Sequence, residues 1–187
     1  MGVIVAVVGL PGCGKSEVVK LFEKHSYYRV YFGDVTFEEM SRLGLEINEK
    51  NERAVRERLR KEYGMDIYAK RSVSKIEEGL KKNGKVVIES MYSFEEYKFL
   101  KSKFRSNFNV LAVMASPNVR YARLEKRPFR PLSRKECEDR DFAQIENLHQ
   151  GGPIAMADFV VINEGTLDEL RDNVEKIITD IEGQARQ

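Results

Sequence analysis

The sequence predicts an α/β fold in which a five-stranded parallel sheet is sandwiched by helices. Short apolar runs rich in β-branched residues alternate with longer helical patterns, as in proteins built from β–α–β units. Glycine or acidic residues follow several of these runs, and the carboxyl ends of parallel strands are where such folds bind ligands. The chain has 187 residues, so we expect a single domain over 1–187.

The composition argues against several classes of protein. Charged residues make up 33% and apolar residues 42%, which is typical of a soluble globular domain. A net charge of +2 is too small to indicate a nucleic-acid or membrane partner, and no apolar run approaches the roughly 18 residues of a membrane span. Cys13 and Cys137 suggest neither a disulfide framework nor a metal site. We expect a cytoplasmic protein, and the sequence leaves its oligomeric state open.

Residues 3–8 form the first expected strand, since the run is short, apolar and rich in valine. Residues 15–25 have the apolar spacing of a helix. Between them the chain matches G-x-x-x-x-G-K-S/T, the pattern of phosphate-binding loops. The matching residues are Gly9, Leu10, Pro11, Gly12, Cys13, Gly14, Lys15 and Ser16.

This context is what polyphosphate binding requires. Loop amides point at the phosphates, and the positive end of the helix dipole lies beneath them. We expect Lys15 to contact the β- and γ-phosphates of ATP and the Ser16 hydroxyl to bind Mg²⁺. ATP and Mg²⁺ are therefore the expected cofactors.

Residues 28–32 are the second expected strand, and Asp34 follows its end. This position faces the phosphate-binding loop in a parallel sheet, so Asp34 is a candidate for the acceptor side of a site. Alternatively, Asp34 caps the next helix. Residues 35–83 exceed the length of one crossover and are predicted to form a helical insertion that binds the acceptor. Its expected helices are 36–43, 49–63 and 66–82.

Three arginines recur on one face of the middle helix of this insertion, namely Arg53, Arg56 and Arg60. Guanidinium groups in a row can bind a phosphate on the acceptor. The alternative is a solvated face, because Glu49 and Glu52 lie four residues before Arg53 and Arg56 and form favourable pairs. The pattern leaves both interpretations open.

Residues 85–89 form the third expected strand, which ends at Glu89. An acid at this position holds Mg²⁺ or one of its waters in P-loop proteins, although a purely structural role is the alternative. An amphipathic helix over 94–103 and a fourth strand over 109–115 follow.

The segment 120–135 is strongly basic, with seven Lys or Arg residues against one acid, Glu125. Pro128 and Pro131 interrupt it. Such a segment between two helices is predicted to be a lid that covers a triphosphate and neutralises charge on the transferred group. The alternative is a solvated or RNA-facing loop. The expected catalytic residues are Lys15, Asp34, Arg123, Arg127 and Arg130.

Residues 151–153 are expected to form a turn and 158–162 the fifth strand. Thr166 and Glu169 form a capping box for a last helix with one apolar face. The expected core comprises 1–34, 84–119 and 136–187.

Taken in order, these motifs resemble the nucleoside-monophosphate kinase superfamily over nearly the whole chain. The stretch 157–167 is similar to the tail of dephospho-coenzyme A kinase, in which the matching segment lines the adenine pocket. The resemblance therefore implies nucleotide contacts at Asn163 and Gly165. Residues 31–36 and 151–158 look like an archaeal, adenylate-kinase-related and dephospho-coenzyme A kinase-like family. This resemblance implies transfer of the ATP γ-phosphoryl group to a small nucleotide-like acceptor.

The sequence departs from adenylate kinases at two places. Phe37 stands where they carry an arginine, and Glu89 is followed by Ser-Met-Tyr instead of glycine and a nearby arginine. Two arginines that grip the AMP phosphate are thus missing, and one of Arg53, Arg56 and Arg60 is expected to substitute. The alternative function is a nucleotide-binding regulatory ATPase without small-molecule kinase activity.

Overall fold

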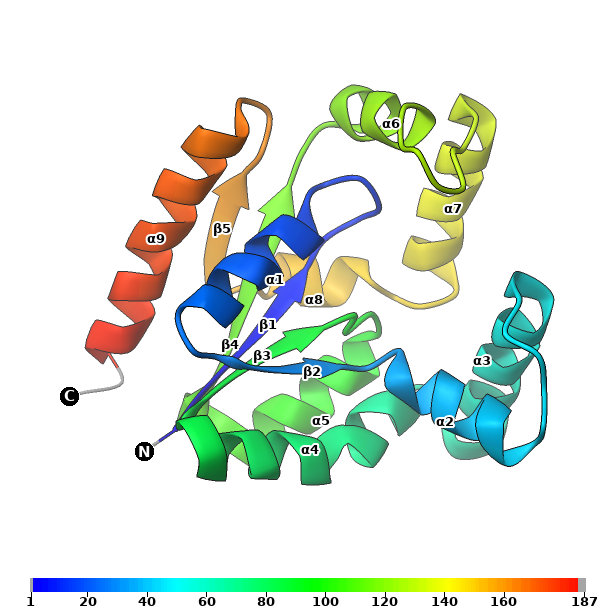
Figure 1. Cartoon of the computed structure of the whole chain (residues 1–187), viewed down its shortest axis with the longest axis horizontal. Coiled ribbons are helices and arrows are strands. Elements are labelled where there is room, and N and C mark those ends of the chain that lie inside the picture. The colour runs from blue at the N-terminus through cyan, green and yellow to red at the C-terminus, as the bar shows by residue number, and fades with distance from the viewer. Residues whose placement is uncertain (1, 185–187) are drawn as a thin grey trace.

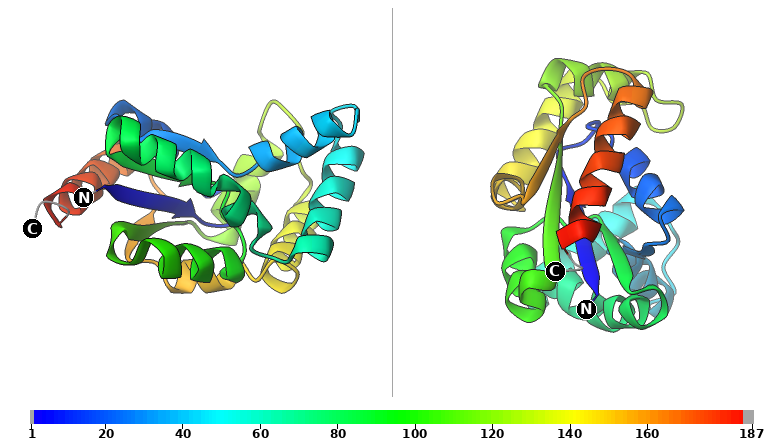
Figure 2. Two further views of the ribbon diagram at one scale, coloured as in Figure 1. Left: turned by 90° about the horizontal axis from the view of Figure 1, so that it is seen from below. Right: turned by 90° about the vertical axis from the view of Figure 1, so that its left-hand side faces the viewer.

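A computed structural model describes residues 2–184 and contains one parallel sheet with the strand order β2-β3-β1-β4-β5. Helices cover both faces of the sheet (Figures 1 and 2). This arrangement confirms the predicted fold class. The strands are β1 (Val3–Val8), β2 (Tyr28–Tyr31), β3 (Lys85–Glu89), β4 (Phe108–Met114) and β5 (Phe159–Ile162).

The helices begin and end close to the positions that the apolar spacing predicts, with a 3₁₀ turn at Arg105–Asn107 before β4. Within residues 2–184 no helix is long and apolar enough to cross a membrane. The helices are α1 (Lys15–Lys24), α2 (Asp34–Arg42), α3 (Glu49–Tyr63), α4 (Ile67–Asn83), α5 (Phe94–Phe104), α6 (Pro117–Glu125), α7 (Arg134–Glu146), α8 (Gly151–Ala155) and α9 (Leu167–Gln184).

Strand β1 is the centre of the sheet and is buried along its whole length. It pairs with β3, with Val7 opposite Glu89, and with β4, with Val7 opposite Leu111. A strand covered on both faces must be apolar throughout, which explains why residues 3–8 read as one continuous apolar run. The loop that follows β1 therefore emerges at the middle of the carboxyl edge of the sheet.

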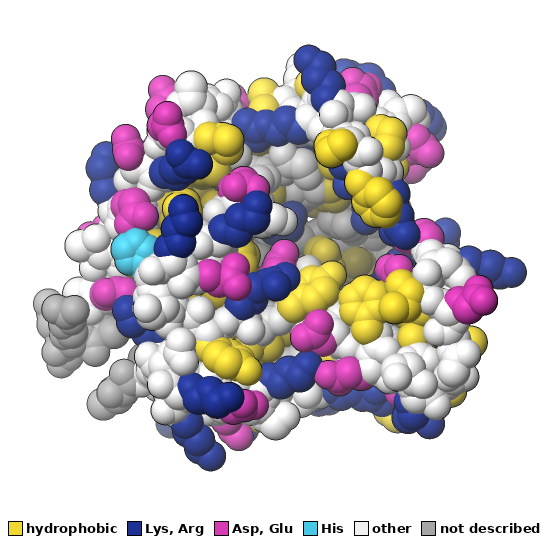
Figure 3. All heavy atoms as spheres, viewed as in Figure 1, with side chains coloured by type: hydrophobic (Ala, Val, Ile, Leu, Met, Phe, Trp, Pro, Cys, Tyr) yellow, Lys and Arg dark blue, Asp and Glu magenta, His cyan; other side chains and the backbone are white. Residues whose placement is uncertain are grey.

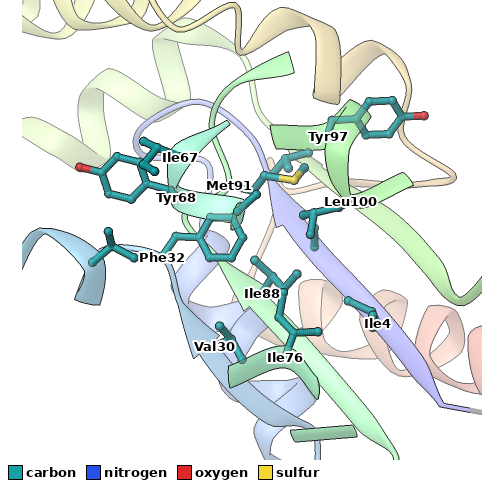
Figure 4. Close-up of a cluster of buried hydrophobic side chains, with 14 of the residues drawn as sticks. Ile4, Val30, Phe32, Ile67, Tyr68, Ile76, Ile88, Met91, Tyr97 and Leu100 are labelled. Carbon is teal, nitrogen blue, oxygen red and sulfur yellow. The ribbon is translucent and has the colours of Figure 1, made fainter. Parts of the chain in front are cut away.

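Alternate residues of the strands pack into two separate cores. Ile4 and Ile88 face α4 and α5, and Figure 4 shows this cluster of buried side chains. Val5 and Val7 face the opposite way and pack against α1 and α9. Burying one such aliphatic side chain contributes about 1.5–3 kcal/mol. The two cores hold the sheet between its helical layers and fix the position of its carboxyl edge.

The predicted turn at residues 151–153 is wrong, because this segment is the short helix α8, which packs against α5 and β4. Pro153 is buried in the first turn of this helix, where proline needs no amide hydrogen bond. The Gly-Gly-Pro sequence carries a turn signal that tertiary packing overrides.

Candidate nucleotide-binding site

Residues 9–16 form a loop that only glycine permits at its tightest points. Gly14, which precedes α1, has φ 103°, and a Cβ there would lie 2.3 Å from the Asn163 amide nitrogen. A Cβ on Gly12, with φ 80°, would lie 2.6 Å from the carbonyl oxygen of Arg120. Backbone from α6 and a side chain from the β5–α9 turn thus approach the loop directly.

The first carbonyl of the loop is held from two sides. The Lys15 ammonium donates to the Gly9 carbonyl at 2.7 Å and to the Leu10 carbonyl at 3.1 Å. The side-chain amide of Gln150, at the start of α8, donates to the same Gly9 carbonyl at 3.1 Å. Gln150 is fully buried, with an exposed fraction of 0%.

Two further loop carbonyls have partners from the second half of the chain. Arg120 of α6 donates to the Pro11 carbonyl at 3.1 Å. Asn163, just after β5, donates through its side-chain amide to the Cys13 carbonyl at 2.8 Å. Four side chains of the protein therefore bond the loop carbonyls. Lys15 and Gln150 bond the first two, and Arg120 and Asn163 bond the others.

The amides of the loop are left for a ligand. Gly14 is the N-cap of α1, and no side chain caps this helix. Such amides, at the positive end of a helix dipole, bind phosphate oxygens. In the part of the chain that the structure describes, no hydrogen-bond partner is found for the amides of Gly12, Gly14, Lys15 and Ser16.

A buried ion pair fixes α6 and α7 beside the loop. The Arg120 guanidinium donates to both carboxylate oxygens of Asp141, at 2.9 and 2.6 Å, and Tyr121 donates its hydroxyl hydrogen to the same group at 2.9 Å. Arg120 and Asp141 are only 3% and 5% exposed. Arg120, which belongs to the predicted lid segment 120–135, is thus anchored to α7 and to the loop.

The three arginines predicted to be catalytic have different partners in the structure. Arg123 donates to the carbonyl of Asn163 at 3.0 Å, and so lies at the β5–α9 turn. Arg127 donates to the carbonyl of Arg130. Arg130 pairs with Glu49 of α3 at 2.9 Å. The structure places only Arg123 beside a residue that touches the loop.

The contact between Arg130 and α3 joins two parts of the chain across a hollow. Figure 3 shows the surface hollowed between the side that carries α6 and α7 and the side that carries α2 and α3. An exposed ion pair of this kind is weak, so it does not lock the two sides together.

Ser16 and Glu89 are the residues that the sequence predicts to hold Mg²⁺. Ser16 is exposed in the first turn of α1. Val87 packs in the core formed with α1. Side chains of a strand alternate between its two faces, so Glu89, two residues later, lies on the face of the sheet that α1 covers. Arg29 of β2 donates to the Glu89 carboxylate at 2.7 Å. Within the described chain no three His, Cys, Asp or Glu side chains group as metal ligands, and Mg²⁺ in phosphate sites needs only one or two protein oxygens.

Asp34 begins α2 at the carboxyl edge of the sheet. The Phe32 amide donates to the Glu89 carbonyl, which brings the ends of β2 and β3 together. The Asp34 side chain is 45% exposed and accepts a hydrogen bond from Lys75 of α4 at 3.3 Å. A half-exposed carboxylate with one long contact is accessible to a ligand.

Arg53 and Arg56 of α3 are engaged along their own helix. Arg53 pairs with Glu57 at 2.8 Å, and its side chain is 74% exposed. Arg56 donates to Glu52 and, one turn earlier, to Glu49. Ion pairs along the helix are what the solvated-face alternative predicts, although Arg53 pairs with Glu57 and not with Glu49.

Arg60 lies differently. Its guanidinium stacks over the Tyr68 ring at 4.7 Å, and its buried Nε has no hydrogen-bond partner within residues 2–184. The Tyr68 hydroxyl bonds Thr36 of α2 at 2.9 Å. Nearby, burial raises the pKa of Glu96 to about 7, while the charge of Arg60 acts in the opposite direction. Arg60 thus faces the interior of the insertion, as does Arg58 of α3, which donates to the buried Glu39 of α2.

Several residues of the site carry no motif in the sequence. Gln150 lies in a loop of ordinary composition, and nothing marks its bond to the Gly9 carbonyl. Arg120 has the same spacing as Arg123, and only the fold separates their roles. For Asp141 the sequence carries one signal of burial, because Asp141 lies four residues after the apolar Cys137, on the same face of the helix. Both of these residues are buried.

Comparisons with known proteins show the family and the fold of this chain. A family model described as an AAA domain matches residues 5–146. A UPF0200 protein of Thermococcus kodakarensis is 36% identical over 181 residues, which cover 95% of this chain and 97% of that relative. The chain belongs to the UPF0200 family. The matched AAA region of this family member includes the whole phosphate-binding loop.

Solved kinases share the fold of this UPF0200 chain. Shikimate kinase from Bacteroides thetaiotaomicron has a TM-score of 0.58 at 15% identity, covering 97% of this chain and 99% of that one. Dephospho-CoA kinase from Campylobacter jejuni has a TM-score of 0.55 at 15% identity, covering 95% and 96%. These values show a shared P-loop kinase fold. Together with the family model and the UPF0200 relative, the shared fold confirms the family resemblance that the sequence motifs predicted.

Proposed function

We propose that the protein transfers the γ-phosphoryl group of MgATP to a small nucleotide-like acceptor in the cytoplasm. The observation that carries this proposal is the loop of residues 9–16. Side chains from elsewhere in the fold bond three of its carbonyls, while the amides of Gly12, Gly14, Lys15 and Ser16 have no partner within the described residues. The acceptor would be a nucleoside monophosphate or a molecule like dephospho-CoA.

The donor side follows from the loop. The amides at the start of α1 would bind the phosphates, and Lys15 would turn from its carbonyl partners to the β- and γ-phosphates. Ser16 and Glu89 would hold Mg²⁺, which neutralises charge on the phosphates. Arg123 lies at the β5–α9 turn, where the resemblance implies adenine contacts by Asn163 and Gly165.

The lid side supplies cations that must move. Arg130 pairs with Glu49 and Arg127 with a neighbouring carbonyl, and both contacts are exposed. Exposed pairs of this kind stabilise by at most about 1 kcal/mol. The two arginines would therefore leave these partners for a triphosphate at a small cost in free energy. Closure of the segment would bring both guanidiniums to the transferred group.

The acceptor side is supported by the helical insertion. Among Arg53, Arg56 and Arg60, the last is the best candidate to bind the acceptor, since its Nε has no partner within the described residues. Asp34 has one of two roles. An acceptor phosphate is already anionic, so Asp34 would only position it, whereas a hydroxyl acceptor must lose a proton, which Asp34 would take. The names of the structural neighbours describe acceptors of shikimate and dephospho-CoA.

The deciding experiment measures ADP release from MgATP against a panel of nucleoside monophosphates and dephospho-CoA. We expect one acceptor class to give a phosphorylated product. Lys15→Met should weaken ATP binding about tenfold or more, because a charge-assisted hydrogen bond contributes about 1.5–3 kcal/mol. The matched control is Lys20→Met, since Lys20 is exposed on the same helix and pairs with Glu17.

Two outcomes would redirect the proposal. ATP binding without any phosphorylated product would support the alternative of a regulatory ATPase. Equal ATP affinity in the wild type and Lys15→Met would remove the nucleotide site itself. Asp34→Asn then separates the acceptor types: a loss of orders of magnitude in kcat at unchanged KM identifies a hydroxyl acceptor.

A further inference from the structure

The Gly9 carbonyl is the one loop carbonyl in the described chain that two side chains share. Lys15 donates to it at 2.7 Å and Gln150 at 3.1 Å. Gly9 is buried, whereas Leu10, whose carbonyl Lys15 also bonds, is half-buried. The Leu10 carbonyl also accepts from the Cys13 amide at 3.3 Å and keeps this donor when Lys15 moves, whereas the Gly9 carbonyl then depends on Gln150.

The other loop carbonyls have donors that need not move when a ligand arrives. Arg120 donates to Pro11 through the Nη1 that also donates to Asp141, and its Nη2 bonds Asp141 as well, so the guanidinium stays in place. The Cys13 carbonyl is held by Asn163. Lys15 is different, because the same ammonium that bonds the Gly9 carbonyl is the group that a triphosphate attracts.

We infer that Gln150 is a positioning residue that keeps the Gly9 carbonyl hydrogen-bonded when Lys15 turns to the phosphates of a bound nucleotide. The inference rests on the proposed function, since it requires a polyphosphate ligand. Without Gln150 the bound state would contain a buried carbonyl with no donor, and such a group is costly. The ligand-free state would still have Lys15 on that carbonyl.

The position of Gln150 supports this role. Its side chain is fully buried, and its Oε1 has no hydrogen-bond partner within residues 2–184, so the bond to Gly9 is what orients the amide. Its backbone amide donates to the Gln144 carbonyl at 3.1 Å, near the end of α7. Gln150 therefore holds the loop from the point where the chain leaves the helix that follows the predicted lid.

The first test is a double-mutant cycle on the ligand-free protein with Gln150→Met and Lys15→Met. Each single variant leaves the Gly9 carbonyl with one donor, and the double variant leaves it with none. We expect the unfolding equilibrium constant of the double variant to exceed the product of the single effects by about tenfold, the cost of one orphaned buried carbonyl. Independent, multiplying effects would overturn the inference whether or not the protein binds a nucleotide.

The second test measures MgATP affinity by calorimetry. Gln150→Met should weaken binding about tenfold or more, while its ligand-free stability changes little. The matched control is Gln144→Met, which removes a half-buried amide from α7 that bonds no loop carbonyl. Equal affinities for Gln150→Met and wild type would overturn the inference. Absence of nucleotide binding in the wild type would instead overturn the proposed function, while the cycle still measures the shared carbonyl.

Discussion

The buried pair of Arg120 and Asp141 offers the sharpest test of how the loop is supported. Replacing Asp141 by Asn keeps the size of the side chain and removes its charge. Arg120 is 3% exposed, so its guanidinium would remain buried with hydrogen bonds only to neutral oxygens, including the carbonyls of Ala115 and Pro11. Tyr121 would also lose a charged acceptor.

The magnitude follows from this burial. Removing one partner of a buried ion pair costs about 3–5 kcal/mol, because the other charge is left uncompensated. The carboxylate accepts three hydrogen bonds, and the single Asn oxygen keeps only some of them, so we expect a loss of about 3 kcal/mol. A domain of this kind has a free energy of unfolding of about 5–15 kcal/mol. Asp141→Asn should therefore remove a large fraction of the stability.

Urea unfolding followed by circular dichroism at pH 7 measures this loss. The midpoint should fall while the slope with denaturant stays constant, since the same surface is exposed on unfolding. Asp139→Asn is the matched control on the same helix, because Asp139 is exposed and pairs with Lys135 at 2.7 Å. We expect the control to change stability by at most about 0.5 kcal/mol.

A double replacement separates charge from packing. Arg120→Met with Asp141→Leu removes both charges and should recover most of the stability lost in Asp141→Asn, since apolar residues often substitute for a buried ion pair. The same variant should still bind ATP more weakly than the wild type, because the Pro11 carbonyl loses its donor. A loss below about 1 kcal/mol in Asp141→Asn would refute the reasoning.

Three further predictions concern titration and the mouth of the site. The hydrogen bond from Arg42 lowers the pKa of buried Glu39 from 4.5 to about 2, with help from Arg71 and against the effect of burial. The stability that Glu39 contributes is thus present above pH 4.5 and lost as the pH falls toward 2, so urea midpoints of Glu39→Gln should decline less over that range than those of the wild type. Burial raises the pKa of Glu96 from 4.5 to about 7, so wild-type stability should fall as the pH rises through that window. Glu96→Gln, which can still accept the capping hydrogen bonds, should remove this decline in thermal unfolding, and an unchanged slope would contradict it. Glu49→Gln, which removes the ion pairs of this residue with Arg130 and with Arg56, should change stability by at most about 1 kcal/mol, with any effect vanishing in high salt.

The sequence by itself determined the layers and the loop. The apolar runs at residues 3–8 and 85–89 were long enough for buried parallel strands, and helical spacing fixed α3 within its observed bounds, Glu49–Tyr63. These features depend on neighbouring residues, so local pattern is enough to predict them. The turn predicted from the Gly-Gly-Pro stretch was wrong. A turn signal depends on neighbouring residues, while the packing of α8 on α5 joins segments that are distant in the chain.

The tertiary structure alone decided which side chains support the loop. Arg120 and Arg123 differ by one turn of helix, yet one is buried on Asp141 and the other lies on the β5–α9 turn. Gln150 reaches a carbonyl 141 residues away in the chain. Hydrogen bonds of this kind depend on distances of about 3 Å between distant segments. No spacing in the sequence encodes them, because they exist only once the sheet has brought its carboxyl edge together.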